Sequence, residues 1–457
     1  MSQTQSLVQS FVVKKGQIEQ FGYKITLIKR TNNSDTETGL TTYARTFRIY
    51  ESLFSKFMYV EGLFVDGGNI IQRLGIQPGD ILRFDIFKDP SDTIDDKISK
   101  EFVVEQIGGQ IRNEGQKSSK YTFRAVSKIG FKSLTNVVKK SYRGRASDIV
   151  KNMCEEFLTP TPDQIQPENF ANTFGALTYT ISSKPPFAAI EEISKHCISE
   201  NDDKKGNYFF YETRDKIYFK PLADIVASGN SFNYIFSPEK NRNQTSASND
   251  YFRIQEFVHH ESTDQRKKIM MGSLKNKTVV FDFVRRTIEE TTFDIRNETK
   301  NVLLLGQNLL MDKEEMTNFV GDVNNDQRET NEEPSLFIRC SGVAYDNTNE
   351  YIGSITSLAI AQKALLNQTV MTVVLLGNPR LKPGDIINIK INQAAGEPRE
   401  ESDFFISGKF LVGSCVHAIT DVEKYVTICD LFKDGYERSI EDYRKDINSQ
   451  FIKERAS

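Results

Sequence analysis

Two stretches far apart in the chain share one alternating pattern of apolar and polar residues. Residues 76–86 read Ile-Gln-Pro-Gly-Asp-Ile-Leu-Arg-Phe-Asp-Ile, and residues 381–391 read Leu-Lys-Pro-Gly-Asp-Ile-Ile-Asn-Ile-Lys-Ile. In both, Pro-Gly favours a tight turn, because proline fixes one φ angle and glycine permits a positive one. The alternation that follows each turn predicts a strand with one buried face.

The residues downstream of the two turns repeat in the same order. The first turn is followed by Phe102-Val103-Val104 and Tyr121-Thr122-Phe123, and the second by Phe410-Leu411-Val412 and Tyr425-Val426-Thr427. A polar insertion follows each Pro-Gly-Asp strand, from Asp89 to Lys100 and from Gln393 to Asp403. These repeats indicate two related small β-barrels or sandwiches. The alternative is that two all-β domains share turn chemistry by chance.

The segment between the repeats is too long for a loop and is expected to fold as its own unit. Ser147-Asp148 offers an N-cap for an amphipathic helix, whose apolar residues recur at three- and four-residue spacing: Ala146, Ile149, Val150, Met153, Cys154, Phe157 and Leu158. A second helix is predicted after Pro185-Pro186, with Phe187, Ile190, Ile193 and Cys197 buried. Tyr208–Tyr211 and Ile217–Phe219 then predict a hairpin.

The rest of the middle region predicts further strands and some mobile segments. Strands are expected at Tyr251–Val258, Lys277–Val284 and Val302–Leu310. Residues 241–250 and 321–334 are polar and nearly free of core-forming residues, so we expect them to be mobile. The tail after Gly435 is highly charged and could form a helix with an apolar stripe of Tyr443, Ile447 and Phe451.

These patterns predict a mixed, mainly β fold with an α+β middle, in which two related small β-barrel (tube-like) domains flank a central α+β region. The predicted divisions are a first tube-like domain at 1–135, an α+β domain at 136–235, a β-rich middle region with a mobile polar stretch at 236–349, a second tube-like domain at 350–436 and a charged C-terminal tail at 437–457.

Composition narrows the class of protein without identifying a chemistry. The 457 residues include 59 Lys and Arg against 62 Asp and Glu, a net charge of −3. This balance disfavours a duplex or anionic-membrane binder, since phosphate binding needs a cationic surface. With 32 Phe, 17 Tyr and no Trp, the aromatic residues favour sheet structure.

The cysteines and the apolar segments indicate the cellular compartment in which the protein folds. Five cysteines (Cys154, Cys197, Cys340, Cys415 and Cys429) lie far apart among apolar neighbours, which predicts reduced core thiols. No segment approaches the roughly 20 apolar residues of a membrane-spanning helix, and the N-terminus lacks the order of a secretory signal. We therefore expect a soluble protein that folds in a reducing compartment.

No catalytic constellation stands above background, and we predict no enzyme and no catalytic, metal or cofactor site. His259-His260-Glu261 with Asp264 superficially suggests a metal site, but strand alternation would send the two imidazoles to opposite faces. His196 and His417 are lone histidines, interpreted as packed or surface residues. The glycine pairs follow neither a P-loop nor a Rossmann spacing.

One basic run needs an interpretation. Lys139-Lys140-Ser141-Tyr142-Arg143-Gly144-Arg145 interleaves a tyrosine with cations, as in surfaces that contact a nucleic-acid backbone. A solvated strand-to-helix connection, or a patch that meets acids on another subunit, is the favoured interpretation. The two barrels also raise an oligonucleotide-binding barrel as a rival, against which the net charge of −3 counts.

A resemblance emerges from the order of the motifs. Gly377-Asn378-Pro379-Arg380-Leu381-Lys382-Pro383-Gly384-Asp385 is followed by Ser407-Gly408-Lys409-Phe410-Leu411-Val412, then Val416-His417 and Tyr425-Val426-Thr427. This resembles the last barrel of the baseplate (tail) hub proteins of contractile-tailed bacteriophages of the T-even type, and of the related late-control and type VI spike hub proteins. The stretch from Ser141 to Val150 is similar to the family's first helix entry, and Pro186 to Leu222 is similar to its middle domain. The likeness covers residues 356–436 and 141–222.

The resemblance implies a homotrimeric ring that joins a sixfold tail tube to a threefold spike and forms part of a DNA exit channel. Its expected partners are a central spike protein, the tail tube protein, inner baseplate (wedge) proteins and the tape measure protein, with DNA only as passing cargo. No spike sequence follows Gly435, so the spike is expected to be a separate polypeptide. The expected location is the virion tail baseplate, after assembly in the host cytoplasm.

Three alternatives remain at this point. The chain could be the hub of a type VI secretion or tailocin-like contractile injection machine, which uses the same ring. It could be a non-enzymatic nucleic-acid-binding double-barrel protein. It could also be a tail-associated hydrolase that acts on the cell wall.

Overall fold

The computed structural model describes residues 21–30, 35–87, 97–111, 118–200, 206–236, 252–260, 272, 274–282, 286–309, 335–341, 352–367, 369–391, 403–420, 424–439, 442 and 445. The stretches 241–250 and 321–334, and the stripe of Tyr443, Ile447 and Phe451, lie outside the described residues.

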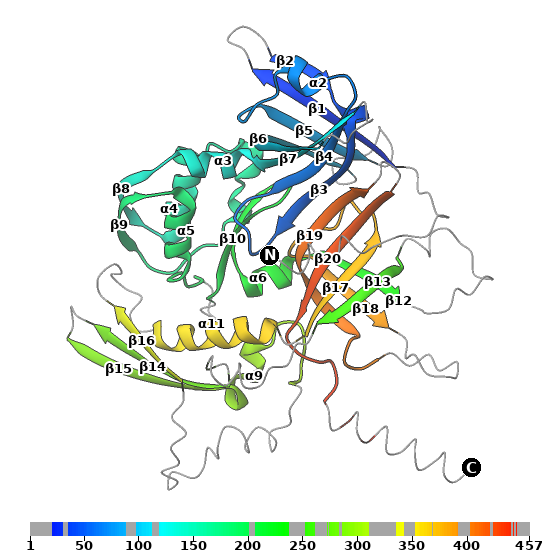
Figure 1. Ribbon diagram of the computed structural model, residues 1–457. Coiled ribbons are helices and arrows are strands. Elements are labelled where there is room, and N and C mark those ends of the chain that lie inside the picture. The colour runs from blue at the N-terminus through cyan, green and yellow to red at the C-terminus, as the bar shows by residue number, and fades with distance from the viewer. Residues whose placement is uncertain are drawn as a thin grey trace, which may run out of the picture.

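A single sheet of thirteen strands runs through both repeats (Figure 1). The mainly β class with an α+β middle is therefore confirmed. The strands form one large, mostly antiparallel sheet, however, and no closed barrel among the described residues. The two sheets continue into each other because β19 (Gly408–Thr420) of the second repeat bonds to β3 (Ala44–Ser52) of the first.

The first repeat, here called module 1, contains seven strands in the order β3-β4-β7-β6-β5-β1-β2. They are β1 Gly22–Arg30, β2 Asp35–Gly39, β3 Ala44–Ser52, β4 Tyr59–Asp66, β5 Ile81–Phe87, β6 Ile98–Ile111 and β7 Ser119–Ser127, with the short helices η1 Thr41–Tyr43 and α2 Ile70–Leu74. Alternate residues of these strands fill one core, centred on Phe47, Phe84 and Phe102.

The second repeat, module 2, follows the same path with the order β13-β17-β20-β19-β18-β12. Its strands are β12 Ser231–Phe236, β13 Ile254–His260, β17 Thr369–Leu376, β18 Ile386–Ile391, β19 Gly408–Thr420 and β20 Lys424–Lys433. Two of them, β12 and β13, precede the predicted range 350–436. An isolated bridge between Ile235 and Arg253 links β12 to the start of β13.

The two Pro-Gly-Asp turns have the same backbone geometry. Gly79 and Gly384 have positive φ angles of +99° and +94°. Gly79 N donates to Val104 O at 2.8 Å and Val104 N to Asp80 O at 2.8 Å; Gly384 N donates to Val412 O, and Val412 N to Asp385 O, at the same distances. The aspartates cap the turns alike, because each accepts the amide three residues before it at 3.0 Å.

Two irregularities of the ladders also recur. The β6–β7 ladder shifts register between Val104 and Gln106, as the β19–β20 ladder does between Val412 and Ser414. The β3–β4 ladder shifts between Ala44 and Thr46, and the β13–β17 ladder between Ile254 and Glu256. Because bulges are specific features of a strand pair, their recurrence supports duplication of one module.

The ladders correct one detail of the sequence comparison. Phe123 pairs with Ile107 in module 1, and Cys429 pairs with Cys415 in module 2. Tyr121 therefore corresponds to Thr427 and not to Tyr425. The polar insertion of module 1 was also drawn too long, since Lys100 belongs to β6 and is buried.

The same alignment reveals a further echo between β3 and β13. Because their ladders correspond at the bulge, Phe47-Arg48-Ile49-Tyr50-Glu51-Ser52 aligns with Phe257-Val258-His259-His260-Glu261-Ser262. The strands next to β5 and β18 differ, since β1 pairs antiparallel with β5 and β12 pairs parallel with β18.

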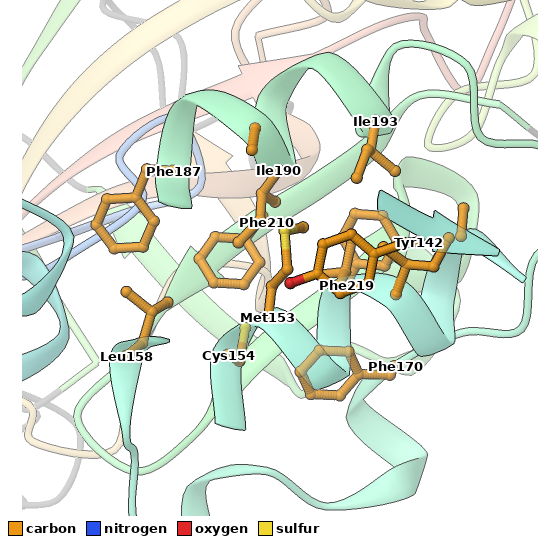
Figure 2. Packing of buried hydrophobic residues seen from close by; sticks show 14 of the residues in the cluster. Tyr142, Met153, Cys154, Leu158, Phe170, Phe187, Ile190, Ile193, Phe210 and Phe219 are labelled. Carbon is orange, nitrogen blue, oxygen red and sulfur yellow. The ribbon is translucent and has the colours of Figure 1, made fainter. Parts of the chain in front are cut away.

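The α+β domain lies between the modules in sequence and packs beside module 1 (Figure 1). Its elements are α3 Lys128–Thr135, β8 Val138–Gly144, α4 Ala146–Met153, η3 Cys154–Leu158, η4 Pro162–Gln164, η5 Pro167–Asn169, β9 Leu177–Lys184, α5 Pro186–Ser194, β10 Tyr208–Glu212, β11 Ile217–Pro221 and α6 Leu222–Ser228. The two predicted helices and the hairpin are thus confirmed. Their apolar side chains converge in one core (Figure 2).

The predicted N-cap of the first helix is wrong. Arg145 occupies the N-cap position of α4. Ser147 is buried inside the first turn, where its Oγ accepts a hydrogen bond from Thr173 N at 3.4 Å and its amide donates to Thr173 Oγ1 at 3.0 Å.

A small subdomain is inserted between β13 and β17 of module 2. It contains β14 Lys275–Asp282, β15 Thr287–Asp294, α9 Ile295–Val302, β16 Ser335–Ser341 and α11 Ile352–Leu366. The helix α11 lies along the three strands (Figure 1), and Leu365 and Ala361 pack against Phe293 and Val302.

The predicted strand at Val302–Leu310 is wrong. Leu304, Leu305 and Gly306 direct their amides at the carboxylate of Asp434, with Gly306 N at 2.9 Å from Oδ1. These donors are therefore satisfied by one buried side chain and not by a neighbouring strand. The contact fastens the inserted subdomain to the end of β20.

The prediction of reduced core thiols is confirmed for the four cysteines whose side chains the structure describes. Cys154, Cys197, Cys415 and Cys429 are buried and form no disulfide. Among the helices that the described ranges contain, none combines the length and the apolar character that crossing a bilayer requires.

Candidate functional site: the buried joint between the modules

The modules meet where β19 pairs antiparallel with β3. The register runs from Ser414 opposite Ser52 to Ile419 opposite Phe47. On β19, Cys415 to Ile419 are all buried. On the facing strand, Phe47, Ile49 and Glu51 point into the core, so an acidic residue occupies a position that strand alternation reserves for apolar side chains.

Glu51 is held by an arginine from the α+β domain. Arg214 lies in the turn between β10 and β11, and its Nε lies 3.5 Å from Glu51 Oε1 while its backbone amide donates to Oε2 at 3.3 Å. Both side chains are nearly inaccessible, with 0% and 3% exposure. Burial raises the pKa of Glu51, whereas the Arg214 guanidinium acts to lower it.

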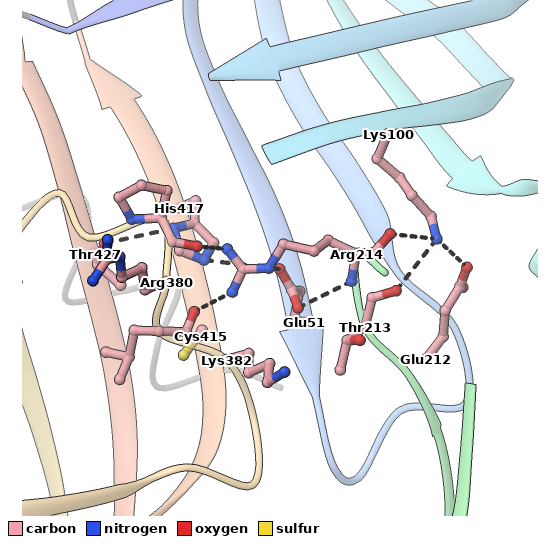
Figure 3. A network of polar contacts seen from close by, with 12 residues as sticks. Glu51, Lys100, Glu212, Thr213, Arg214, Arg380, Lys382, Cys415, His417 and Thr427 are labelled. Carbon is pink, nitrogen blue, oxygen red and sulfur yellow. Dashed lines mark hydrogen bonds and ion pairs between the residues drawn. The ribbon is translucent and has the colours of Figure 1, made fainter. Parts of the chain in front are cut away.

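The same guanidinium also binds module 2. Its two terminal nitrogens donate to the backbone carbonyls of Pro379 and Leu381, in the loop before the second Pro-Gly-Asp turn (Figure 3). Arg214 therefore connects all three parts of the molecule, because its own turn, β3 and the 379–381 loop belong to different domains. A planar guanidinium with five donors suits this task better than a lysine.

A second buried ion pair lies beside the first. Lys100 Nζ of β6 lies 2.8 Å from Glu212 Oε1 and donates to the carbonyls of Thr213 and Arg214 at 3.3 and 3.1 Å. Glu212 Oε2 in turn accepts the amide of Met58 at 3.1 Å. The hairpin turn is thus clamped to module 1 by side-chain and backbone contacts.

His417 completes the network from β19. Its Nδ1 lies 2.8 Å from the Tyr425 hydroxyl, and its Nε2 lies 3.8 Å from Glu51 Oε1. Burial, reinforced by the nearby Arg214 charge, holds the pKa of His417 well below its ordinary value, so the imidazole is neutral. His417 is packed, as predicted, but its place beside Glu51 was not predicted.

The second Pro-Gly-Asp turn lies next to this joint. Asp385 accepts hydrogen bonds from Lys382 N at 3.0 Å and from both nitrogens of Asn230 at 3.2 Å. Burial raises the pKa of Asp385 to about 6. The Pro383–Asp385 turn is itself buried, in contrast to the exposed Gln77–Gly79 turn of module 1.

This arrangement suits assembly better than chemistry. Glu51 and His417 are fully buried, so a substrate cannot reach either group. Arg214 and Lys100 are each bonded to an acid and to backbone carbonyls, which leaves them no role in binding an anion. Removing one partner of such a pair would leave an uncompensated charge in the core, so the network specifies how the parts fit together.

The other residues considered from the sequence lie away from the joint. His259 and His260 both belong to β13, where His259 is exposed and His260 Nε2 lies 2.9 Å from Thr372 Oγ1. Glu261 and Asp264 are outside the described residues. His196 is exposed just after α5.

The basic run forms β8 and part of the turn into α4. Lys140 pairs with Glu156 at 2.7 Å and Arg145 with Glu200 at 2.8 Å. Tyr142 is buried in the core of the α+β domain (Figure 2), so its ring cannot stack on a base. The interleaved tyrosine that favoured nucleic-acid contact is thus a core residue.

Comparison with known proteins identifies the fold. No family model matches the chain, and no curated protein does so. The crystal structure of the tail protein from Neisseria meningitidis MC58 aligns over 91% of this chain and 98% of its own, with a TM-score of 0.52 and 10% identity. The 43 kDa tail protein of prophage MuSo2 from Shewanella oneidensis covers 90% of this chain and 99% of its own, with a TM-score of 0.53 and 8% identity.

These two structures define the class. The chain has the fold of phage tail proteins, and the resemblance to tail hub proteins is confirmed at the level of the fold. A component of the type VI secretion system from Escherichia coli also aligns, over 92% of this chain and 80% of its own, with a TM-score of 0.42 and 9% identity.

Proposed function

We propose that the chain is the structural hub of a contractile phage tail baseplate, a ring of three subunits that joins the sixfold tail tube to a threefold central spike. The observation that carries this proposal is the pair of equivalent modules fused edge to edge through β19 and β3. Three such chains offer six similar modules to the tube while keeping threefold symmetry for the spike.

The partners we propose are those that the resemblance to tail hub proteins implies. The tube protein would meet the ring of modules, the spike its threefold face, and inner baseplate (wedge) proteins its rim, with the tape measure protein as a further contact. DNA would pass through the centre as cargo. The net charge of −3 suits a channel in which DNA has to slide, because cationic walls would hold phosphates.

The proposed role is mechanical, so we also propose that the chain catalyses no reaction. The buried charged groups that could otherwise serve acid–base chemistry are paired with one another, as Glu51 is with Arg214. Purified protein is expected to leave a peptidoglycan suspension turbid, and clearing would reveal the hydrolase alternative.

Immunogold electron microscopy tests the hub role directly. Antibodies against the chain are expected to label the tail end distal to the capsid, on contractile particles purified from the cells that make it. Label on capsid-free particles would indicate a type VI or tailocin-like machine. Absence of label from all particles would overturn the proposal, and retention of single-stranded oligonucleotides on filters at moderate salt would favour the nucleic-acid alternative.

A further inference from the structure

Two of the buried cysteines face each other across neighbouring strands. Cys415 of β19 lies directly opposite Cys429 of β20 in the antiparallel ladder, and the two Sγ atoms are 3.4 Å apart. Both side chains are fully buried in the core of module 2. The sequence spaces all five cysteines widely, so it is the fold that brings these two thiols together.

The backbone places this pair where cross-strand side chains come closest. Gly377 N donates to Tyr425 O at 3.1 Å, one residue beyond the ladder between β17 and β20. Backbone groups alternate between the two edges of a strand, so Cys429, four residues further along, also directs its N–H and C=O at β17. Cys415 and Cys429 are therefore a non-hydrogen-bonded pair, for which Cα atoms lie about 4.5 Å apart. This separation falls in the range of about 4.4–6.8 Å that a disulfide requires.

The equivalent position of module 1 carries no thiol. Ile107 pairs there with Phe123, and both belong to the core of that module or pack against it. The thiol pair is thus specific to the strand that makes the joint, because Cys415 also lies opposite Glu51 of β3. A bond between the two sulfurs would fasten β19 to β20 at the level where β19 holds β3.

We propose that Cys415 and Cys429 form a redox site, in which the two thiols close to a cross-strand disulfide in the presence of a low-molecular-mass disulfide and reopen on reduction. Shortening the sulfur contact from 3.4 Å to a bond of about 2.05 Å needs rotation of the two side chains and no movement of the strands. We expect the pair to be reduced where the chain folds and to close in an oxidising medium. The bridge would form whether or not the chain is a tail hub.

Closure is a thiol–disulfide exchange in two steps. One cysteine loses its proton and attacks the small disulfide, which gives a mixed disulfide and releases one small thiol. The second cysteine then loses its proton and displaces the other small thiol from the mixed disulfide. The two cysteines together lose two electrons and two protons, and the two small thiols carry them away.

Burial controls the rate of this exchange. Neither thiol is exposed, and burial raises the pKa of Cys415 well above its ordinary value, so the reactive thiolate is rare in the closed sheet. Exchange therefore requires local opening of the β19–β20 ladder. We expect oxidation to be slow in buffer and faster in urea at concentrations below the unfolding transition.

The natural full-length chain tests the redox site without any substitution. Protein purified under reducing conditions is incubated with oxidised glutathione, and the remaining thiols are alkylated in denaturant. Intact mass is expected to show a chain that has lost two hydrogens, and peptide mapping is expected to join Cys415 to Cys429. Cys154 and Cys197 are the internal control and should be alkylated in full, because they are also buried but lie in the core of the α+β domain, where Cys197 Sγ donates to Ile193 O at 3.2 Å.

Thermal unfolding is the second measurement. The bridge is expected to raise the Tm of the oxidised chain by at least about 2 °C over that of the reduced chain, and dithiothreitol should reverse the rise. Cys429→Ala cannot form the bridge, so its Tm should be the same in both media. Cys197→Ala is the matched control, since it removes a buried thiol elsewhere and should keep the oxidative rise.

Each outcome supports or overturns the redox site. A Cys415–Cys429 bridge that forms below the unfolding transition, while Cys154 and Cys197 stay free, supports it. Full alkylation of both residues after prolonged oxidation would overturn it, and so would a glutathione adduct that remains on either one. A bridge that appears only in strong urea would also overturn it, because the fold would then not direct the pairing. If Cys429→Ala fails to fold, the peptide map of the natural chain decides alone.

Discussion

The Pro-Gly-Asp turns of the two modules have the same backbone hydrogen bonds and different surroundings. Around Gly79 the turn is exposed, and a Cβ added there would meet no atom within 4 Å. Around Gly384 the turn is buried, and an added Cβ would lie 3.3 Å from the Tyr211 hydroxyl and 3.2 Å from Ile225. The turn therefore forms without tertiary cover, and the α+β domain uses only the second copy as a docking surface.

The joint has a buried ion pair at Glu51, and removing this pair should lower the stability of the fold more than any other change considered below. Glu51→Ala is expected to destabilise the fold by about 3–5 kcal/mol, because it leaves the Arg214 charge in the core. Since the chain has no Trp, the urea midpoint is best followed by far-UV circular dichroism.

An exposed ion pair between module 1 and the α+β domain supplies the control. Lys56 and Glu191 lie 2.6 Å apart, with Glu191 about half exposed at 48%. Glu191→Ala should cost less than about 1 kcal/mol. Equal losses for Glu191→Ala and Glu51→Ala would contradict the role assigned to the buried network.

Substitution of the two turn glycines should destabilise the two modules to different extents. Gly79→Val is expected to cost about 1–2 kcal/mol, since a β-branched residue is strained at a φ of +99°. Gly384→Val carries the same backbone strain and also crowds Tyr211 and Ile225, so about 2–4 kcal/mol is expected. Thermal unfolding of the two variants side by side measures the difference, and a larger loss at Gly79 would refute the docking interpretation.

The buried aspartate predicts a pH effect. Because burial raises the pKa of Asp385 to about 6, the folded chain holds this proton more tightly than the unfolded chain. Its contribution to stability is thus present below about pH 4 and is lost as the pH rises through about 6. The unfolding free energy of the natural chain, relative to Asp385→Asn, should fall by roughly 2 kcal/mol between pH 4 and 6.5.

The comparison with Asp385→Asn is needed because His417 acts in the opposite direction. Its lowered pKa means that stability is lost as the pH falls below the ordinary range of histidine. Both chains carry this contribution, so it cancels in the difference. A difference that is flat with pH would show that Asp385 is ionised throughout.

The equivalent strands β1 and β12 give the smallest expected difference. β1 is bonded on both edges, to β5 and β2, whereas β12 forms a ladder, within the described ranges, only with β18, in parallel. Amides of β12 should therefore exchange faster than those of β1. Mass spectrometry of peptides covering 22–30 and 231–236 measures this, and slower exchange in β12 would run against the assigned pairing.

Short-range sequence patterns correctly predicted the turns, helices and hairpin whose formation depends on nearby residues. The two turns, the helices after Arg145 and Pro185 and the hairpin at Tyr208 follow from spacing and turn chemistry, and all are present. Module 2 was predicted too short because β12 and β13 pair with strands more than a hundred residues away. No short-range pattern reports such a partner.

The joint escaped prediction for a related reason. Glu51 lies in a strand that also carries Arg45 and Arg48, and Arg214 lies in a Thr-Arg-Asp turn that was interpreted as a simple hairpin connection. Each residue alone suggests a solvated charge, and only their meeting makes them a core pair. The repeated Phe-x-x-x-Glu-Ser of residues 47–52 and 257–262 was the one signal that could have singled out Glu51.

The insertion between β13 and β17 has a consequence for synthesis. A ribosome releases β12 and β13 long before β17–β20 exist, so those early strands must wait, with their apolar faces uncovered, until nearly the whole chain has emerged. A truncated product would present a lone β13 and no completed second sheet. A chain that ends before β17–β20 therefore has no finished second half.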